Sequence, residues 1–386
     1  MILSGILPQE TRAFLKAVPS LIEKTFPIPG RFRGAMPSQI AELSRLLTNR
    51  RGGRSLSYLS RPNFLSAYMH YFLPWNLYRL CILLHGTDIA LACGNTITDL
   101  GSGPLTFVSA LWIARPDLRN IPLEINCIDR SAPALEAGKN FFDALSADGV
   151  MNEKTGGKNS WKINLVRTDI DIRRAAARQK KQAALVCAVN MFNEIYENLS
   201  HSNLNGLRHT ADNAARFMHS YAEADAGILT VEPGVPQSGH FISFLRASFM
   251  ELGRQPMSPC THTAACPYAP SGKKRWCHFA FETIDAPKEL VRLSAAARLP
   301  KERLALSYLY TGVEKKNEKP QIRVISDVFA LPQNRYGCYG CCDEGLVLLA
   351  GEKKRIEEIV SGSLVNKSGK SSQRDAKSGA IIMEVI

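Results

Sequence analysis

The fold is decided by the stretch "ITDLGSGPLTFVSALW" at residues 97–112, where a short strand-like run leads through Asp99, Gly101 and Gly103 into a helical pattern. Glycine at two alternate positions lets the backbone turn tightly and approach a ligand at a distance where a side chain would collide. In a doubly wound sheet, ligands bind beyond the carboxyl ends of the strands, which is where this turn falls. The stretch therefore predicts a nucleotide-type site at the first strand–helix turn of an α/β domain.

Short apolar runs continue after this turn and alternate with helical patterns. Each run is rich in Ile, Val and Leu and is followed by a polar turn. Such alternation predicts parallel strands joined by crossover helices, and so a doubly wound sheet. The runs assigned to the second to fifth strands lie at residues 123–129, 163–169, 184–192 and 226–233.

Acidic residues stand at the tips of the first three strands. Asp129 ends the second run, where a carboxylate can bind both ribose hydroxyls, and Asp169 ends the third, near an adenine edge. A glycine pair alone is a weak signal, and the three acids in order strengthen it. A dinucleotide site wants a third glycine, but Gly103 is followed by Pro104. The pattern resembles the S-adenosylmethionine site of the class I methyltransferases, which implies that cofactor and a Rossmann-like sheet.

The catalytic loop of a methyltransferase is not recognisable. Methyltransferases that act on base amines often carry Asn or Asp, two prolines and an aromatic residue after the fourth strand. Here that place reads "VNMFNEIYE" (189–197), which has Asn190 and Asn193 but neither proline. Asn190 therefore either contacts the cofactor or acts in catalysis, or it only caps the strand. Glu232, which ends the fifth run, either faces the pocket or starts a helix.

Changes in the secondary-structure pattern along the sequence indicate four parts. Residues 1–90 read as helices, with amphipathic patterns at 38–49 and at 63–86, the latter broken at Pro74. After about residue 300, strand patterns without long helices occur at 304–313, 321–329 and 345–351. We therefore predict a helical region (1–90), a methyltransferase-like domain (91–300) with a cysteine-rich insertion (254–280), a β-rich C-terminal piece (301–355) and a polar, flexible tail (356–386).

Composition limits the class of protein. The 386 residues are 45% hydrophobic and 22% charged, and no apolar run approaches the roughly 18 residues that a membrane span needs. The first residues lack a secretion signal and include Glu10, so we expect a bacterial cytoplasm, no membrane partner and no disulfides among the ten cysteines.

The net charge of +13 indicates a polyanionic partner, and nucleic acid is the natural one. For any single basic run, a solvated surface is the simpler interpretation. Four separate runs together with the net excess favour nucleic acid. These runs lie at residues 45–54, 173–181, 273–275 and 353–355.

The cysteines gather in two patches. Residues 258–279, "SPCTHTAACPYAPSGKKRWCHF", hold three of them, and "RYGCYGCCDEGL" (335–346) holds three more. In a reducing compartment such patches indicate a metal site, and four thiolates suit either zinc or a [4Fe–4S] cluster. Spacing alone does not separate the two.

At this point the motifs resemble one family. The order of "DLGSGP" (99–104), "VEPGVPQSG" (231–239), "CTHTAACP" (260–267), "WCHF" (276–279) and "CCDEG" (341–345) is similar to methyltransferase-like proteins associated with the small ribosomal subunit, found in mitochondria and bacteria. The resemblance runs from about residue 60 to residue 350, and the cysteine motifs carry most of its specificity.

The resemblance implies S-adenosylmethionine binding, a four-cysteine [4Fe–4S] site and a role in small-subunit maturation through contact with its ribosomal RNA. It implies Asp99, Gly101, Gly103, Asp129, Asp169 and Asn190 as cofactor-binding residues. It implies Cys260, Cys266, Cys277 and Cys341 as cluster ligands, with His262 and His278 as hydrogen-bonding neighbours. The chain departs from the pattern because Cys338 and Cys342 flank Cys341, which leaves the fourth ligand open. Whether the methyl group is transferred is also open, and an inactive RNA-binding assembly factor with a zinc site is the alternative.

Overall fold

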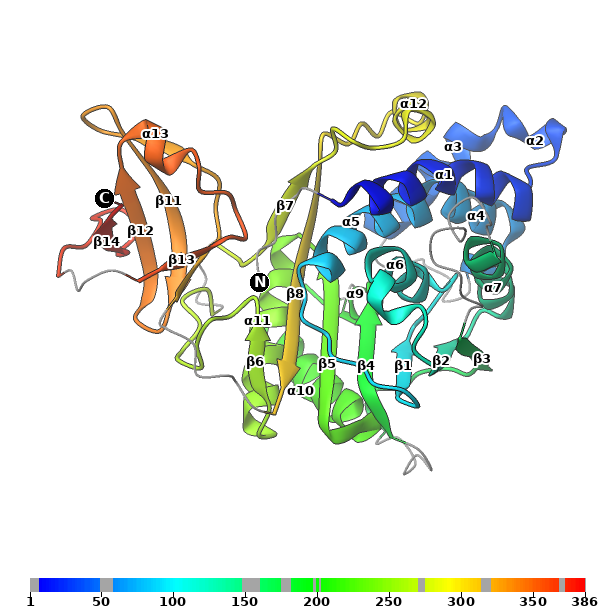
Figure 1. Cartoon of the computed structure of the whole chain (residues 1–386), viewed down its shortest axis with the longest axis horizontal. Coiled ribbons are helices and arrows are strands. Elements are labelled where there is room, and N and C mark those ends of the chain that lie inside the picture. Colours follow the sequence, from blue (N-terminus) through cyan, green and yellow to red (C-terminus); the bar gives the residue numbers. More distant parts are fainter. Residues whose placement is uncertain are drawn as a thin grey trace.

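The computed structural model describes residues 7–48, 58–147, 160–174, 182–196, 199–200, 203–269, 275–313, 321–367 and 372–385. Figure 1 shows three parts in a row: helices from the start of the chain at one end, a central sheet, and a separate β sheet from the end of the chain. None of the helices in these ranges is long and apolar enough to cross a membrane.

The N-terminal part is helical, as predicted. A π-helical turn at Tyr68–Phe72 leads directly into the helix that contains Pro74 in its first turn, so the break predicted at this proline is a local widening of a continuous helical segment. Proline has no backbone N–H to donate, and a π-turn accommodates the missing hydrogen bond. The elements are α1 (Gln9–Thr25), α2 (Gly30–Arg33), α3 (Met36–Thr48), η1 (Tyr58–Ser60), α4 (Pro62–Ala67), η2 (Tyr68–Phe72) and α5 (Leu73–His85).

The central sheet has eight strands in the order β3-β2-β1-β4-β5-β8-β6, with β7 also paired to β8. Strands β1 to β5 are parallel, whereas β8 runs antiparallel to β5, β6 and β7. One antiparallel strand inserted next to the fifth parallel strand is the topology of the class I methyltransferases, so the predicted fold class is confirmed. The strands are β1 (Thr96–Leu100), β2 (Leu123–Asp129), β3 (Trp161–Arg167), β4 (Ala183–Val189), β5 (Ala222–Pro233), β6 (Gln255–Ser258), β7 (Phe279–Glu282) and β8 (Arg303–Gly312).

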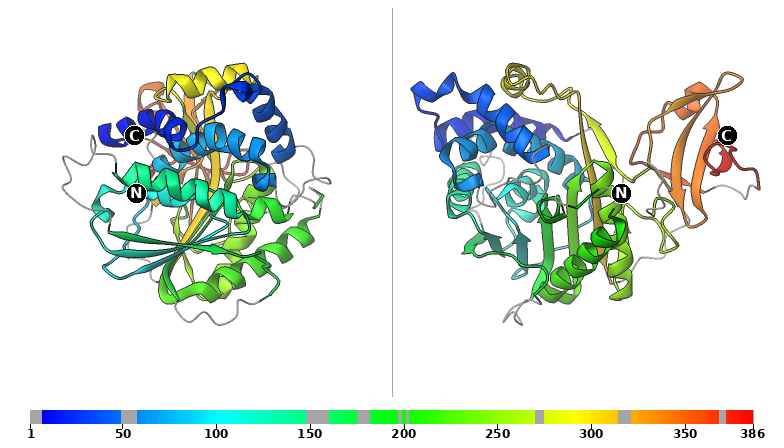
Figure 2. Two further views of the ribbon diagram at one scale, coloured as in Figure 1. Left: turned by 90° about the vertical axis from the view of Figure 1, so that its right-hand side faces the viewer. Right: turned by 180° about the vertical axis from the view of Figure 1, so that it is seen from behind.

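Helices cover both faces of this sheet (Figure 2). One core contains α6 and α7 together with α1 and α5, and Trp112, Phe142 and Trp161 meet in it ring to ring. The other core contains α10 and α11. The covering helices are α6 (Thr106–Ala114), η3 (Pro116–Leu118), α7 (Ala132–Ala147), α9 (Phe192–Tyr196), α10 (Leu204–Tyr221), α11 (Pro236–Glu251) and α12 (Lys288–Ala296).

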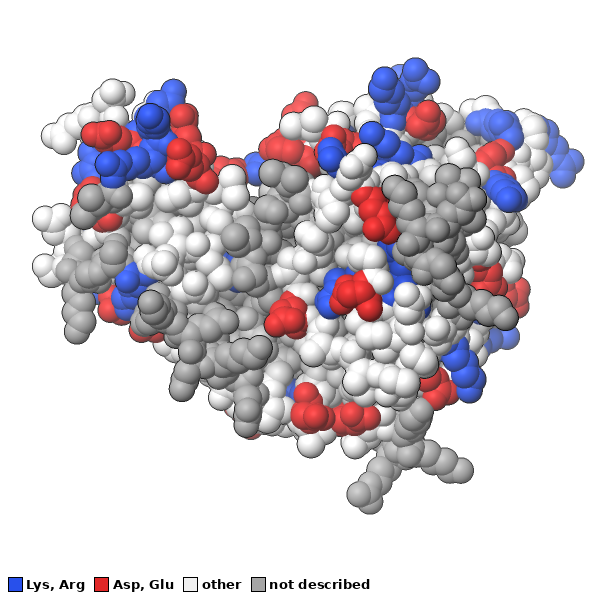
Figure 3. Space-filling model, in the orientation of Figure 1, with Lys and Arg blue, Asp and Glu red and all other residues white. Residues whose placement is uncertain are grey.

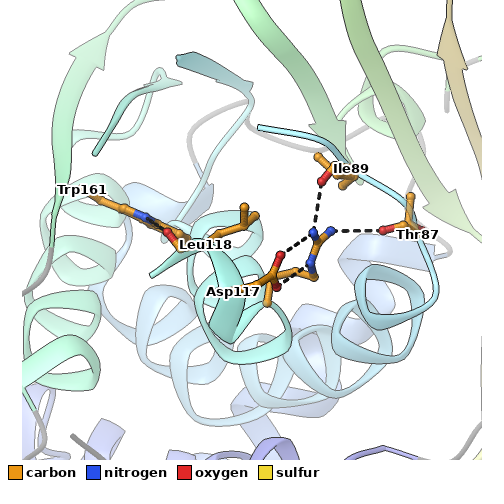
Figure 4. A network of polar contacts seen from close by, with 6 residues as sticks. Thr87, Ile89, Asp117, Leu118 and Trp161 are labelled. Atoms are coloured by element: carbon orange, nitrogen blue, oxygen red, sulfur yellow. Dashed lines mark hydrogen bonds and ion pairs between the residues drawn. The ribbon is translucent and has the colours of Figure 1, made fainter. Parts of the chain in front are cut away.

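The link between the helical region and the sheet is held by one arginine. Arg115 donates to the carbonyl oxygens of Thr87 (3.2 Å) and Ile89 (3.1 Å) and pairs with Asp117, whose carboxylate lies 2.7 Å from its Nη2 (Figure 4). The guanidinium group therefore holds the segment that connects α5 to β1 against the C-terminal end of α6.

Strand β8 corrects one expectation. The run at 304–313 was assigned to the C-terminal piece, but β8 lies in the central sheet, between β5 and β6. Seven of its ten residues are buried, and from sequence alone such a mostly apolar run fits either sheet.

The C-terminal sheet has the order β13-β9-β11-β12-β14, with β10 paired to β11. The predicted flexible tail is wrong for β13 and β14, which belong to this sheet. Apolar side chains such as Ile381 and Met383 are buried in this sheet, although the surrounding sequence is polar. The elements are β9 (Gln321–Val324), β10 (Phe329–Leu331), β11 (Arg335–Cys342), β12 (Gly345–Gly351), α13 (Lys353–Ile356), β13 (Leu364–Asn366) and β14 (Ile381–Glu384).

Candidate functional site

A cavity of about 1100 Å³ lies at the carboxyl ends of the parallel strands. Its walls come from the first strand–helix turn, the tips of β2 to β4, the start of α11 and the N-terminal helices. All six residues predicted to bind the cofactor line this one cavity: Asp99, Gly101, Gly103, Asp129, Asp169 and Asn190.

The two glycines of the turn are required for different reasons. Both have positive φ, +68° at Gly101 and +50° at Gly103. A Cβ on Gly101 would lie 2.7 Å from Cγ of Met191, so a larger residue would displace that side chain. A Cβ on Gly103 would meet no atom within 4 Å, so this glycine faces open space in the cavity. The turn therefore leaves room for a ligand next to the backbone.

Asp99 is a buried acid beside the turn. Its Oδ1 accepts from the thiol of Cys187 at 3.4 Å, while Oδ2 is buried without a hydrogen-bond partner in the described part of the chain. Burial raises the pKa of Asp99 to about 7, and the negative charge of Asp129 acts in the same direction. A buried carboxyl oxygen without a donor, in a residue that lines a cavity, fits a ligand that brings a donor or a positive charge.

Asp129 is tied to the glycine turn. Its Oδ2 accepts from the backbone N–H of Gly103 at 2.9 Å, and its Oδ1 accepts from that of Ser131 at 2.8 Å. Burial raises the pKa of this carboxyl, and the two backbone donors oppose the shift. Each oxygen of a carboxylate has a second lone pair, so Asp129 can still accept from ribose hydroxyls. Asp169 lies at the exposed rim, with its carboxylate 3.3 Å from Nε of Arg130.

Asn190 stands at the tip of β4 in the left-handed conformation, with φ of +53°. Its backbone N–H donates to the carbonyl of Val231 at 2.8 Å, and its Oδ1 accepts from Nη2 of Arg79 at 3.1 Å. Asn tolerates this backbone region better than most residues. Asn190 therefore both ends the strand and presents its amide at the cavity wall.

Glu232 positions the segment that follows Asn190. Its carboxyl accepts from the backbone N–H groups of Phe192 (2.9 Å) and Asn193 (3.0 Å) and from the hydroxyl of Tyr196 (3.0 Å). Burial raises its pKa to about 8, against the lowering effect of these donors. Glu232 is absent from the cavity wall, so of its two alternatives the structure favours the one at the start of a helix, here α9.

The N-terminal helices contribute site residues that sequence reasoning missed. Tyr58, Tyr68, Phe72, Asn76 and Arg79 all line the cavity. They lie on helices far from the glycine turn in sequence, and no motif marks them. The only available signal was the density of aromatic and polar residues on the helical pattern at 63–86.

The four predicted cluster ligands come from three segments. Cys260 and Cys266 follow β6, Cys277 precedes β7, and Cys341 lies on β11 of the C-terminal sheet. Burial raises the pKa of Cys341, and the charges of Cys260, Cys277 and Cys266 raise it further. The pKa of Cys277 is likewise raised by burial and then by Cys260 and Cys266. The fold thus brings these four thiols into one neighbourhood.

No three His, Cys, Asp or Glu side chains among the described residues lie close enough to hold a single metal ion. A tetrahedral zinc site would place its sulfurs about 3.8 Å apart, because each Zn–S bond is about 2.3 Å. The four thiols therefore influence one another's pKa values, but in the described part of the chain they do not form the ligand set of a single ion.

The strand β11 distinguishes the three cysteines of the second patch. Cys338 and Cys342 are fully buried in the core of the C-terminal sheet. Cys341 belongs to the other face, where it packs with Cys277 against the main core, because alternate residues of a strand face opposite sides. Nε2 of His262 lies 3.1 Å from the sulfur of Cys341, whereas His278 stacks on the ring of Trp276 at 4.9 Å.

Buried arginines fix the loop that carries the first two cysteines. Arg246 of α11 donates to the carbonyl oxygens of His262 (2.9 Å) and Ala264 (2.8 Å). Arg323 of β9 donates to the carbonyl of Pro259 at 2.9 Å, which ties the C-terminal sheet to the same loop.

The basic runs are only partly described. The parts of these runs that lie outside the described residues are 49–54, 175–181 and 273–274. Figure 3 shows Lys and Arg along the upper edge of the molecule, over α12 and α13. The exposed run Lys353–Arg355 forms part of α13, and Lys353 is paired with Glu357.

Comparison with known proteins gives one family. The family model described as "Mitochondrial small ribosomal subunit Rsm22" matches residues 94–337, more than half of the chain. A search of curated proteins found no match.

The solved structures that match include distant methyltransferases. One is an S-adenosylmethionine-dependent methyltransferase from Geobacter sulfurreducens in complex with S-adenosyl-L-homocysteine, 13% identical, with a TM-score of 0.33, covering 70% of this chain and 97% of that one. Another, from Thiobacillus denitrificans with the same ligand, is 12% identical, with a TM-score of 0.33, covering 74% and 99%. Similarity this low carries no argument about ligand or partner, and the fold assignment rests on strand order.

The raised pKa of Asp99 predicts how stability depends on pH. The folded protein keeps this proton up to about pH 7, whereas the unfolded chain loses it near 3.8. The contribution of Asp99 to stability is therefore fully present below about pH 4 and is lost as pH rises through 7. In Asp99→Asn, the free energy of unfolding measured in urea should fall less steeply between pH 5 and 8, by up to about 1.4 kcal/mol per pH unit.

Asp117→Asn is the control for this measurement. Arg115 lowers the pKa of the Asp117 carboxyl, so that group is ionised throughout the same pH range and its replacement should leave the slope unchanged. Equal slopes for the wild type and Asp99→Asn would contradict the assignment.

Proposed function

Because the chain belongs to the Rsm22 family of the mitochondrial small ribosomal subunit, we propose that it binds S-adenosylmethionine and acts on the RNA of a small ribosomal subunit during assembly. The observation that carries the proposal is the convergence of Asp99, the glycine pair, Asp129, Asp169 and Asn190 on one cavity at the carboxyl edge of a class I methyltransferase sheet. The family match supports the link to the small subunit.

The cavity suits this cofactor chemically. Asp129 would accept from the ribose hydroxyls, the open space at Gly103 would admit the ligand next to the backbone, and Asp99 would face the positively charged amino acid end. S-adenosylmethionine supplies an activated methyl group on a sulfonium. Transfer then requires mainly that an acceptor be held in line with that methyl group.

The segment from Asn190 to Tyr196 would hold the acceptor in line with that methyl group. Glu232 fixes its backbone through two N–H groups, and Arg79 fixes the Asn190 side chain. These contacts favour an ordered acceptor site and so favour turnover over a purely structural role. The loop lacks the prolines of base-amine methyltransferases, so the proposal assigns no general base to it.

For the cysteine cluster we propose a [4Fe–4S] centre held by Cys260, Cys266, Cys277 and Cys341. The donor set is four thiols, which is the ligand chemistry of such a cluster. Neither the family description nor the structural relatives name a cluster, so the support is the arrangement of the thiols alone. The centre would join the loop after β6 to the C-terminal sheet.

Cofactor binding is tested by Asp129→Ala. Loss of a partly buried carboxylate that would bind two hydroxyls should weaken S-adenosylhomocysteine binding at least about tenfold by calorimetry, since a hydrogen bond to a charged group contributes about 1.5–3 kcal/mol. Asp143→Ala removes a carboxylate of α7 whose side chain is 52% exposed and should bind like the wild type. Absence of binding to the wild type would reject the cofactor.

The cluster is tested by a matched pair of neighbouring cysteines. After anaerobic purification, the wild type and Cys342→Ser should each contain about four iron and four sulfide per chain, because Cys342 faces the core of the C-terminal sheet. Cys341→Ser should lose most of both. One zinc per chain without iron would favour the zinc alternative, and equal loss in both variants would reject Cys341 as the specific ligand.

The subunit role is tested in cells of the source organism. The tagged protein should co-sediment with small-subunit particles in a gradient, and its deletion should deplete mature small subunits. Mass mapping of small-subunit RNA from the deletion strain should lack one methyl group. An unchanged map with defective subunits would leave only the assembly role, and neither defect would reject the proposed function.

A further inference from the structure

The cavity extends well beyond the residues assigned to the cofactor. Its volume of about 1100 Å³ lies at the upper end of the roughly 300–1,000 Å³ typical of ligand pockets. The glycine turn and the tips of β2 and β3 form one wall. Other parts of the lining come from α3, η1, η2 and α5 of the N-terminal region and from α10. A second ligand therefore has its own surface in the same cavity.

The part of the lining that comes from the N-terminal helices carries aromatic rings. Tyr68 and Phe72 both line the cavity, and their rings are nearly parallel, with centroids 5.7 Å apart and an interplanar angle of 27°. Tyr58 lies on the same wall. Aromatic rings on a cavity wall suit a flat, apolar-faced ring such as an unstacked nucleobase.

A network of amides lies beside the rings. Nη2 of Arg79 donates to Oδ1 of Asn76 (2.9 Å) and to Oδ1 of Asn190 (3.1 Å), and Nδ2 of Asn76 donates to the hydroxyl of Tyr68 (3.3 Å). Because the guanidinium takes Oδ1 of Asn190, the amide orientation is fixed and its Nδ2 donor is directed away from Arg79.

A hydrogen-bond acceptor without a partner lies in the same cavity as this network. Oδ1 of Asn193, another cavity residue, is buried without a hydrogen-bond partner among the residues that the structure describes. A donor on Asn190 and an acceptor on Asn193 are the pair of groups that reads the edge of a base.

Arg79 itself does not form a phosphate site. Its Nη1 donates to the carbonyl of Ala305 at 2.9 Å and its Nη2 donates to the two asparagines, while its Nε is buried without a hydrogen-bond partner among the described residues. With both terminal nitrogens engaged, Arg79 does not offer the paired donors that bind a phosphate, so this part of the cavity lining favours a neutral ring.

We propose that the part of the cavity lined by Tyr68, Phe72, Asn190 and Asn193 receives a single nucleobase extruded from the RNA acceptor. This inference rests on the proposed function, because it places the base in the same cavity as the cofactor bound at the glycine turn. Extruding a base costs a few kcal/mol, which stacking on an aromatic platform offsets. The N-terminal helices are then the part of the chain that selects the acceptor.

The test uses the full chain saturated with S-adenosylhomocysteine, which occupies the cofactor side. Binding of the four nucleoside 5′-monophosphates is measured by saturation-transfer NMR, with base protons as the readout. One base should give a signal in the wild type and in Tyr68→Phe. Tyr68→Leu should weaken its binding at least about fivefold, the lower limit for loss of one stacking contact.

The controls separate this proposal from the one on which it rests. Calorimetry with S-adenosylhomocysteine should give wild-type affinity for Tyr68→Leu, which shows that the variant is folded. Tyr336→Leu, on β11 of the C-terminal sheet, should leave base binding unchanged. If the cofactor product binds but no base does, or if Tyr68→Leu binds the base as the wild type does, the acceptor is not a nucleobase on this wall and a protein substrate becomes the better hypothesis. Failure of the cofactor product to bind overturns both proposals.

Discussion

The structure depends on the pairing of one antiparallel strand, β8, into the central sheet. Six consecutive residue pairs join β8 to β5, and β6 and β7 in turn pair with β8. The chain between β6 and β7 is the loop that carries Cys260, Cys266 and Cys277, so both ends of this loop are held by the same strand. Near the start of β8, the carbonyl of Ala305 accepts a hydrogen bond from Arg79. Two residues later in the same strand, Ser307 donates to the carbonyl of Cys277 at 2.8 Å. The cavity and the cysteine neighbourhood thus share one support.

The ionisable groups at the carboxyl edge of the central sheet are held mainly by neutral hydrogen-bonding groups. Asp129 and Glu232 are each satisfied mainly by backbone N–H groups, and Arg79 mainly by carbonyl and amide oxygens. A charge surrounded by fixed dipoles can be buried without a direct ion pair. Such groups cannot move without breaking several hydrogen bonds, so they hold the loop after β4 in one geometry. Two atoms depart from this pattern, because Oδ2 of Asp99 and Nε of Arg79 are buried without a hydrogen-bond partner among the described residues.

Sequence reasoning found the part of the site that is local in the chain. A strand, a glycine turn and an acid at the next strand tip are short patterns, and they located Asp99, Gly101, Gly103 and Asp129 in the cavity. It could not find Arg79 or Tyr68, because their place depends on how a helix packs over the sheet and not on spacing. It misplaced the strand 304–313 because a mostly apolar run does not reveal its partner strand. The tail strands were hidden by polar composition, and the cellular compartment stays a prediction.

The choice among Cys338, Cys341 and Cys342 shows what a fold adds to a motif. Three thiols within five residues are equivalent as sequence, but a strand divides them by parity. Once β11 pairs with β9 and β12, Cys338 and Cys342 must enter the C-terminal core and Cys341 must face the central domain. Arg323, buried on the neighbouring strand, holds the facing loop through the carbonyl of Pro259. The contact between the two sheets therefore places Cys341, and not Cys338 or Cys342, at a junction that side-chain hydrogen bonds already align.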